Sequence, residues 1–149
     1  VLAEHSNDDV DLFHVLALCL VHDIVEIDAG DTFAYDVAAN GDKEERERRA
    51  AELLFGLLPS DQAEYLWRLW EEYEAMETPE SRFANAVDRM QPAMLNHVAG
   101  EASTWKEHGV TMTQAVKRLS PIGDGSQTLW EHTQSIIDEA RQRGHIRDE

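Results

Sequence analysis

The sequence is poor in basic residues. Its 149 residues include 30 Asp and Glu but only 13 Lys and Arg, which gives a formal net charge of −17. Nucleic acids and anionic membranes are bound by clustered cations that displace counterions, so we expect neither as a partner. A negatively charged substrate would need a metal ion to supply the positive charge that the surface lacks.

Cysteine and long apolar runs are also scarce. Cys19 is the single cysteine and lies in an apolar stretch, which excludes an internal disulfide framework and fits a reducing compartment. No apolar run approaches the roughly 20 residues of a membrane span, and no signal-peptide pattern occurs. We therefore expect a cytoplasmic protein whose partners are a metal ion, a small molecule or a second copy of itself.

Strand patterns are the third absence. The apolar periodicity is helical nearly everywhere, and no convincing run alternates as a strand does. Length and a hydrophobic content of 42% suit one domain with a single core. The sequence thus predicts an all-α domain over residues 1–149. We expect its helices at about residues 10–28, 42–57, 60–76, from 79 onward, a short one from 111, and 126–143.

The first of these helices is apolar on most faces, which predicts that it lies in the core. Gly30 is expected to end it. In the helix from Pro79, Pro92 cannot donate a hydrogen bond to the carbonyl of Asp88, so a distortion beside Asp88 is predicted.

The pair His22-Asp23 interrupts the apolar first helix. Buried polar groups are costly without partners, and an isolated pair of this kind is most often a hydrogen-bonded core histidine beside an interhelical carboxylate. Here Glu26 follows at helical spacing and Asp31 lies just beyond the helix end. Three carboxylates gathered together repel one another unless a cation binds, so the cluster favours a metal site.

Other polar residues have weaker indications. Lys43 and Arg46 could meet a phosphate, although a solvated helix face is the simpler interpretation. Arg89 is expected to orient Asp88 or to form a salt bridge, and His14 to be structural or exposed.

Three segments together resemble the HD-domain phosphohydrolases. They are residues 3–6 (Ala-Glu-His-Ser), residues 21–31 with His22-Asp23, and residues 86–89 (Ala-Val-Asp-Arg). The similarity is greatest to the 5′-deoxynucleotidase branch and its bacterial relatives. It implies the helical bundle of the HD domain.

The resemblance also implies a site. One divalent metal ion (Mn, Co, Zn, Fe or Mg) would be bound by His5, His22, Asp23 and Asp88. Glu26 would act as general acid or base, with Asp31 a further active-site carboxylate near the sugar. Members of the family with two metals need additional histidines, and none occurs between Asp23 and Asp88. We therefore favour a single metal.

The leading functional hypothesis is a phosphomonoesterase acting on 5′-deoxynucleoside monophosphates or similar small nucleotides, as a homodimer. The first alternative is a catalytically silent HD-fold dimerisation protein, although such a scaffold has no need of Glu26 and Asp31. The second, a two-metal phosphodiesterase or oxygenase, is disfavoured by the absent histidines.

One part of the family pattern is absent. Relatives have a full apolar helix after Ala-Glu-His-Ser, whereas Ser6 here leads directly to Asn7. Helix rise places His22 about 16 Å from Asp11, and the link from His5 to Asp11 spans at most roughly 20 Å. His5 could barely reach the site. We therefore expect that a helix is missing between Ser6 and Asn7 and that the start is clipped.

Overall fold

The computed structural model describes residues 1–35 and 41–149. Over these residues the regular structure is helical, apart from an isolated bridge between Thr111 and Arg147. The helices are α1 (Leu12–Val21), α2 (Glu26–Ala29), α3 (Lys43–Phe55), α4 (Ser60–Ala75), α5 (Pro79–Ala99), α6 (Thr104–Glu107), α7 (Met112–Leu119), α8 (Ile122–Gly125) and α9 (Gln127–Gln142). Three 3-10 turns join them: η1 (Leu2–His5), η2 (His22–Val25) and η3 (Gly100–Ala102). The predicted all-α class is confirmed.

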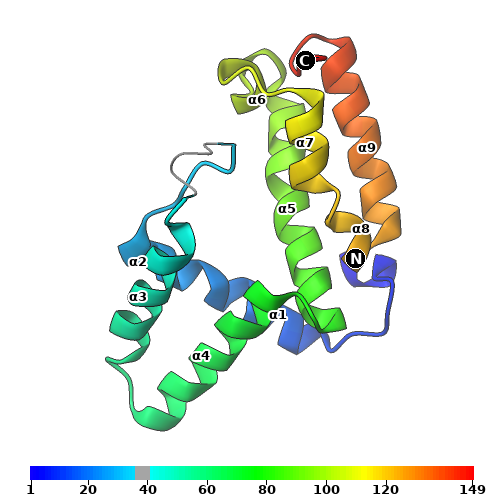
Figure 1. Cartoon of the computed structure of the whole chain (residues 1–149). Helices are drawn as coiled ribbons and strands as arrows, with labels where there is room; N and C mark the ends of the chain where they lie inside the picture. Colours follow the sequence, from blue (N-terminus) through cyan, green and yellow to red (C-terminus); the bar gives the residue numbers. More distant parts are fainter. Residues whose placement is uncertain (36–40) are drawn as a thin grey trace.

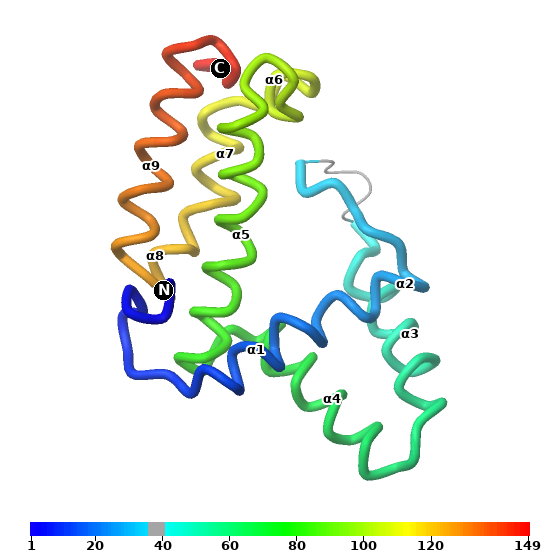
Figure 2. Tube along the Cα trace, turned by 180° about the vertical axis from the view of Figure 1, so that it is seen from behind, coloured from blue at the N-terminus to red at the C-terminus, as the bar shows by residue number. Residues whose placement is uncertain are grey.

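Two groups of helices meet at α5. Helices α5, α7, α8 and α9 lie together on one side, and α1 to α4 form the other arm (Figures 1 and 2). Helix α1 packs against both α4 and α5, so it connects the arms. The core runs through both groups, with Leu18, Phe83, Trp105 and Ile137 among its largest buried side chains.

Helix ends follow the expected local chemistry. Thr78 caps α5 in a capping box with Ser81, and Thr111 caps α7 in a capping box with Gln114. Gly30 ends α2 with a φ of 80°, a backbone conformation that favours glycine. Helix α5 continues as an α-helix through Pro92, so the predicted distortion does not break it. Residues 36–40, which fall between the first two predicted helices, lie outside the described residues.

The first predicted helix differs from expectation in two ways. It is divided into α1, η2 and α2, with the change of helix type at His22-Asp23. It also buries only one face, because the exposed fractions of Phe13, Leu20 and Ile27 are 85%, 74% and 78%. The prediction that this helix is surrounded by core was therefore wrong. Apolar character shows that a face favours burial, but the described residues include no element that covers this one.

The N-terminal segment is tied to the opposite group. The amide of Asn7 donates to the carbonyl of Gly125 at 3.0 Å, and its side chain bridges Gly123 and the amide of Gln127. The start of the chain thus lies beside α8 and α9 (Figure 2). None of the described helices is both long and apolar enough to cross a membrane.

Candidate active site

His22 is held in one orientation by its surroundings. Its Nδ1 lies 2.8 Å from the carbonyl oxygen of Cys19, and its ring stacks on Tyr73 with centroids 4.0 Å apart. In an α-helix, the backbone amide of Asp23 would donate to this same Cys19 carbonyl. The contact with the His22 side chain therefore fits the change to a 3-10 turn at this point. A carbonyl accepts only, so Nδ1 carries the proton and Nε2 is left for other partners.

Two carboxylates face that nitrogen. Nε2 of His22 lies 2.9 Å from Oδ1 of Asp23 and 3.5 Å from Oδ1 of Asp88. Burial would lower the pKa of His22, but its hydrogen bond to Asp88 and the charges of both carboxylates raise the pKa overall. A neutral imidazole would point its lone pair at two anions, so this position requires a proton or another cation.

Asp88 comes from the middle of α5 and is positioned by Tyr73 as well as His22. Burial would raise the pKa of Asp88, but the hydrogen bond and charge of His22, together with a hydrogen bond from Tyr73, hold the pKa below its usual value. Burial and the neighbouring Asp88 in turn raise the pKa of the Tyr73 hydroxyl. Tyr73 therefore stays neutral and donates to Asp88.

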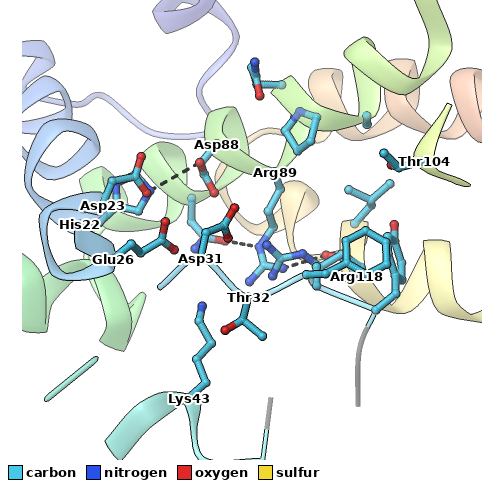
Figure 3. A pocket seen from close by; sticks show the side chains of 18 of the residues that line it. His22, Asp23, Glu26, Asp31, Thr32, Lys43, Asp88, Arg89, Thr104 and Arg118 are labelled. Atoms are coloured by element: carbon cyan, nitrogen blue, oxygen red, sulfur yellow. Dashed lines mark hydrogen bonds and ion pairs between the residues drawn. The ribbon is translucent and has the colours of Figure 1, made fainter. Parts of the chain in front are cut away.

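These groups border a cavity of about 460 Å³ between the two arms. Glu26 and Asp31 line the same cavity as His22, Asp23 and Asp88 (Figure 3). Burial, with the charges of Asp31 and then Asp23, raises the pKa of Glu26. Five of the six residues predicted for the site therefore meet at one cavity.

His5 is the sixth, and the structure does not bring it there. It does not line the cavity, and its carbonyl accepts a hydrogen bond from Ser126 at the start of α9. His14 pairs with Glu72 at 2.8 Å, in keeping with a structural role. Among the residues that the structure describes, no group of three or more His, Cys, Asp or Glu already has the arrangement of a metal site. His22, Asp23 and Asp88 instead turn their donor atoms toward one another.

The donor chemistry nevertheless suits a divalent cation. One imidazole nitrogen and two carboxylates are ligands for Mn, Fe, Co and Zn, and their two negative charges match the dication. The Cys19 carbonyl and the Tyr73 hydroxyl provide the outer contacts that commonly orient metal ligands.

The basic residues near the cavity differ from their expected roles. Lys43 lines the cavity and pairs with Glu47 at 3.2 Å. Arg46 donates to the carbonyl of Ala29 at 2.6 Å and to Thr32 at 3.0 Å, so it fixes the chain that leads to Asp31. Both are half-buried, and the interpretation as a purely solvated face was wrong.

Within the part of the chain that the structure describes, Arg89 forms no salt bridge and no hydrogen bond with Asp88. It donates to the side chain of Asn85 and to the backbone carbonyl of Arg118. Arg118 itself lines the cavity from α7.

Aromatic side chains border another part of the cavity. Phe33, Tyr35 and Trp105 all line it, and the indole of Trp105 donates to the Tyr35 hydroxyl at 3.1 Å. Phe33 packs edge-on against Tyr35 and remains 37% exposed. Phe33 also packs against His108, with ring centroids 4.4 Å apart. The border is therefore an aromatic cluster, a kind of surface on which a planar ligand can pack.

Several of these residues escaped the sequence analysis. Tyr73, Asn85, Arg118 and the residues of the aromatic border were not predicted as site residues. The spacing of Asn85 and Asp88, three residues apart on α5, is a signal that places both on one helical face. No local signal marks Arg118 or Tyr73, because their neighbours come from other helices.

Known proteins similar to this chain identify its family. The sequence model of the HD domain matches residues 1–130. The 5′-deoxynucleotidase HDDC2 of Bos taurus is 36% identical over 88 residues, which are 59% of this chain and 41% of that protein. Its counterpart in Mus musculus is 34% identical over 92 residues, or 61% and 46% of the two chains. The chain thus spans less than half the length of these curated relatives.

A solved structure covers more of the chain. The crystal structure of a predicted metal-dependent phosphohydrolase from Magnetospirillum magnetotacticum superimposes with a TM-score of 0.91. It is 49% identical and covers 98% of this chain and 72% of its own. The family match over residues 1–130, with the HD-domain residues gathered at one cavity, gives the assignment. The chain belongs to the HD-domain family.

Proposed function

We propose that the protein is a metal-dependent phosphomonoesterase that releases phosphate from 5′-deoxynucleoside monophosphates or similar small nucleotides. The observation that carries the proposal is the convergence of His22, Asp23 and Asp88 on a cavity that Glu26 also lines. The names of the relatives, a 5′-deoxynucleotidase and a predicted metal-dependent phosphohydrolase, support the same chemistry.

Each residue has a role in this proposal. His22, Asp23 and Asp88 would hold one divalent ion, which would polarise the phosphoryl group and lower the pKa of the attacking water. Glu26, whose pKa is raised by burial, would move a proton to or from the reacting oxygens. Asp31 would accept from sugar hydroxyls, and the aromatic border of the cavity would pack against the base.

Hydrolysis by the metal-free full-length protein tests the function. We expect phosphate release from deoxynucleoside monophosphates only after Mn, Co, Zn or Mg is added, with ribonucleotides as the comparison. Asp23→Ala should abolish the release, because it removes a ligand. Asp28→Ala is the matched control, since Asp28 is exposed on α2 and does not line the cavity. Release that needs no metal, or that survives Asp23→Ala, would refute the proposal.

The Tyr73 hydroxyl gives a second expected result. Tyr73→Phe keeps the ring that stacks on His22 but removes the donor to Asp88, so we expect about tenfold weaker metal binding. Calorimetric titration with Mn measures the change. Tyr65→Phe, at an exposed position on the same helix, should bind as the wild type does. Equal affinity in both variants would show that Tyr73 does not position Asp88.

We also propose that a further helix lies between Ser6 and Asn7 in the natural chain. The uncovered apolar face of α1, which includes Phe13, Leu16 and Leu20, supports this. With that helix present, His5 is the proposed fourth ligand. A coding sequence that runs directly from Ser6 to Asn7 would overturn both statements. The homodimer and the cytoplasmic location remain predictions, and light scattering would test the first.

A further inference from the structure

Two arginines at the cavity form no direct ion pair with any acidic side chain that the structure describes. Arg89 on α5 and Arg118 on α7 both line the cavity. Within the described ranges, no ion pair of 4.0 Å or less includes either of them. The chain has 30 acidic residues and 13 basic ones. Unpaired guanidinium groups are therefore unexpected here, most of all where they are half-buried.

The neighbouring cations behave differently. Lys43 pairs with Glu47, and Arg46 pairs with Asp42 at 3.0 Å. Their charges are already compensated within the protein. Arg89 and Arg118 face the same cavity and interact with the charge of Asp88 only at longer range than an ion pair. Their donors are therefore the ones available to an anionic ligand.

Arg89 is fixed in place by neutral acceptors. It donates through Nε to the side chain of Asn85, which is 7% exposed, and through Nη1 to the backbone carbonyl of Arg118 at 2.8 Å. These bonds hold the guanidinium without cancelling its charge. The hydrogen bond to the Arg118 carbonyl connects α5 to α7 and brings Arg118 beside Arg89. The arrangement is preorganised, and preorganised donors bind an anion at low reorganisation cost.

The two arginines lie across the cavity from the acidic residues. Figure 3 shows Arg89 and Arg118 on one side of the cavity, with His22, Asp23 and Asp88 on the other. Asp88 and Arg89 are consecutive on α5, so this helix contributes one residue to each side of the cavity. A ligand between them would meet carboxylates on one side and guanidinium groups on the other.

We propose that Arg89 and Arg118 form an oxyanion subsite that binds the nonbridging oxygens of a phosphate group in this cavity. The proposal deepens the proposed function and rests on it for the identity of the phosphate as the one to be released. Guanidinium groups present a planar fork of donors that matches phosphate oxygens. The subsite would orient the phosphate from the side away from the acidic cluster.

Binding of inorganic phosphate tests the subsite apart from catalysis. Calorimetry with the full-length protein, after chelation and again with Mn, should show phosphate binding to the wild type in both states. Arg118→Ala should weaken it about tenfold or more, since it removes a charged hydrogen-bond donor. Arg118→Lys should recover only part, because lysine offers a point charge and no fork. The Arg118 backbone carbonyl that holds Arg89 is unchanged in both variants.

Lys117→Ala is the matched control, because Lys117 is exposed on the same helix and does not line the cavity. It should bind phosphate as the wild type does. Equal binding by Arg118→Ala and wild type, or no phosphate binding by the chelated wild type, would overturn the subsite. Phosphate binding that depends on Arg118 without any metal-stimulated hydrolysis would sustain the subsite and refute the proposed function. Metal-stimulated hydrolysis with an unchanged KM in Arg118→Ala would sustain the proposed function and refute the subsite.

Discussion

Glu26→Gln should lower kcat by about 10²- to 10⁴-fold, the usual contribution of a general acid or base, and leave metal affinity unchanged. Glutamine keeps the size of the side chain but cannot exchange a proton at neutral pH. Glu26 lines the cavity beside Asp23 and Asp31 without a hydrogen bond to His22 among the contacts described. Its loss should therefore affect proton transfer and not the ligands. Steady-state kinetics and Mn titration measure the two effects separately.

The pH profile of kcat distinguishes the two roles of Glu26. Burial, with the charges of Asp31 and Asp23, raises the pKa of its carboxyl group. A general base must be ionised, so its rate falls as pH drops through that raised pKa. A general acid must be protonated, so its rate falls as pH rises through the same pKa. The corresponding limb should be absent from the profile of Glu26→Gln.

Asp28→Asn is the control, because it removes a carboxylate from the exposed side of the same short helix. It should leave both kcat and the pH profile unchanged. If Glu26→Gln abolishes metal binding, then Glu26 is a ligand and its assignment as a proton-transfer group is wrong.

Local spacing was sufficient to group part of this site. His22, Asp23, Glu26 and Asp31 lie within ten residues, so helix geometry alone brings them to one region. Asp88 is different, because it lies 57 positions after Asp31, the nearest of these residues in sequence. Only the family resemblance linked it to the pair, and the packing of α1 on α5 brings it there.

The residues that sequence reasoning missed depend on packing between helices. Tyr73 has the apolar spacing of an ordinary core residue, and nothing in α4 indicates that its ring meets His22 from η2. Arg118 is one of two adjacent basic residues on α7, and its place at the cavity follows from the packing of α7 against α5. Periodicity gives the buried face of a helix but not the partner of each side chain.

The error on α1 has a related cause. The apolar faces of residues 10–28 favour burial, yet Phe13 and Leu20 lie on a face that no described element covers. Short elements were also missed. Helices α6 and α8 have four residues each, too few for a helical period to be recognised.

Gly125→Ala should destabilise the protein by about 3 kcal/mol, at the upper end of the usual cost of overpacking. Gly125 ends α8, where it lies directly against the backbone of α5. A Cβ there would lie 2.6 Å from the carbonyl carbon of Arg82 and 2.8 Å from Cα of Phe83. These are main-chain atoms near the start of α5, and they cannot move aside as a flexible side chain can, so α5 and α8 must separate.

Gly123→Ala is the matched control on the same four-residue helix. Its Cβ would meet Cδ1 of Trp130 at 3.4 Å, an ordinary contact with a side chain. Urea unfolding of both variants, followed by circular dichroism, should show a large loss only for Gly125→Ala. Because α5 carries Asp88 and Arg89, the same variant should also weaken metal and phosphate binding. Equal stability of the two variants would show that α8 can move away from α5 without cost. The close contact of Gly125 with α5 would then not be what positions the cavity residues of α5.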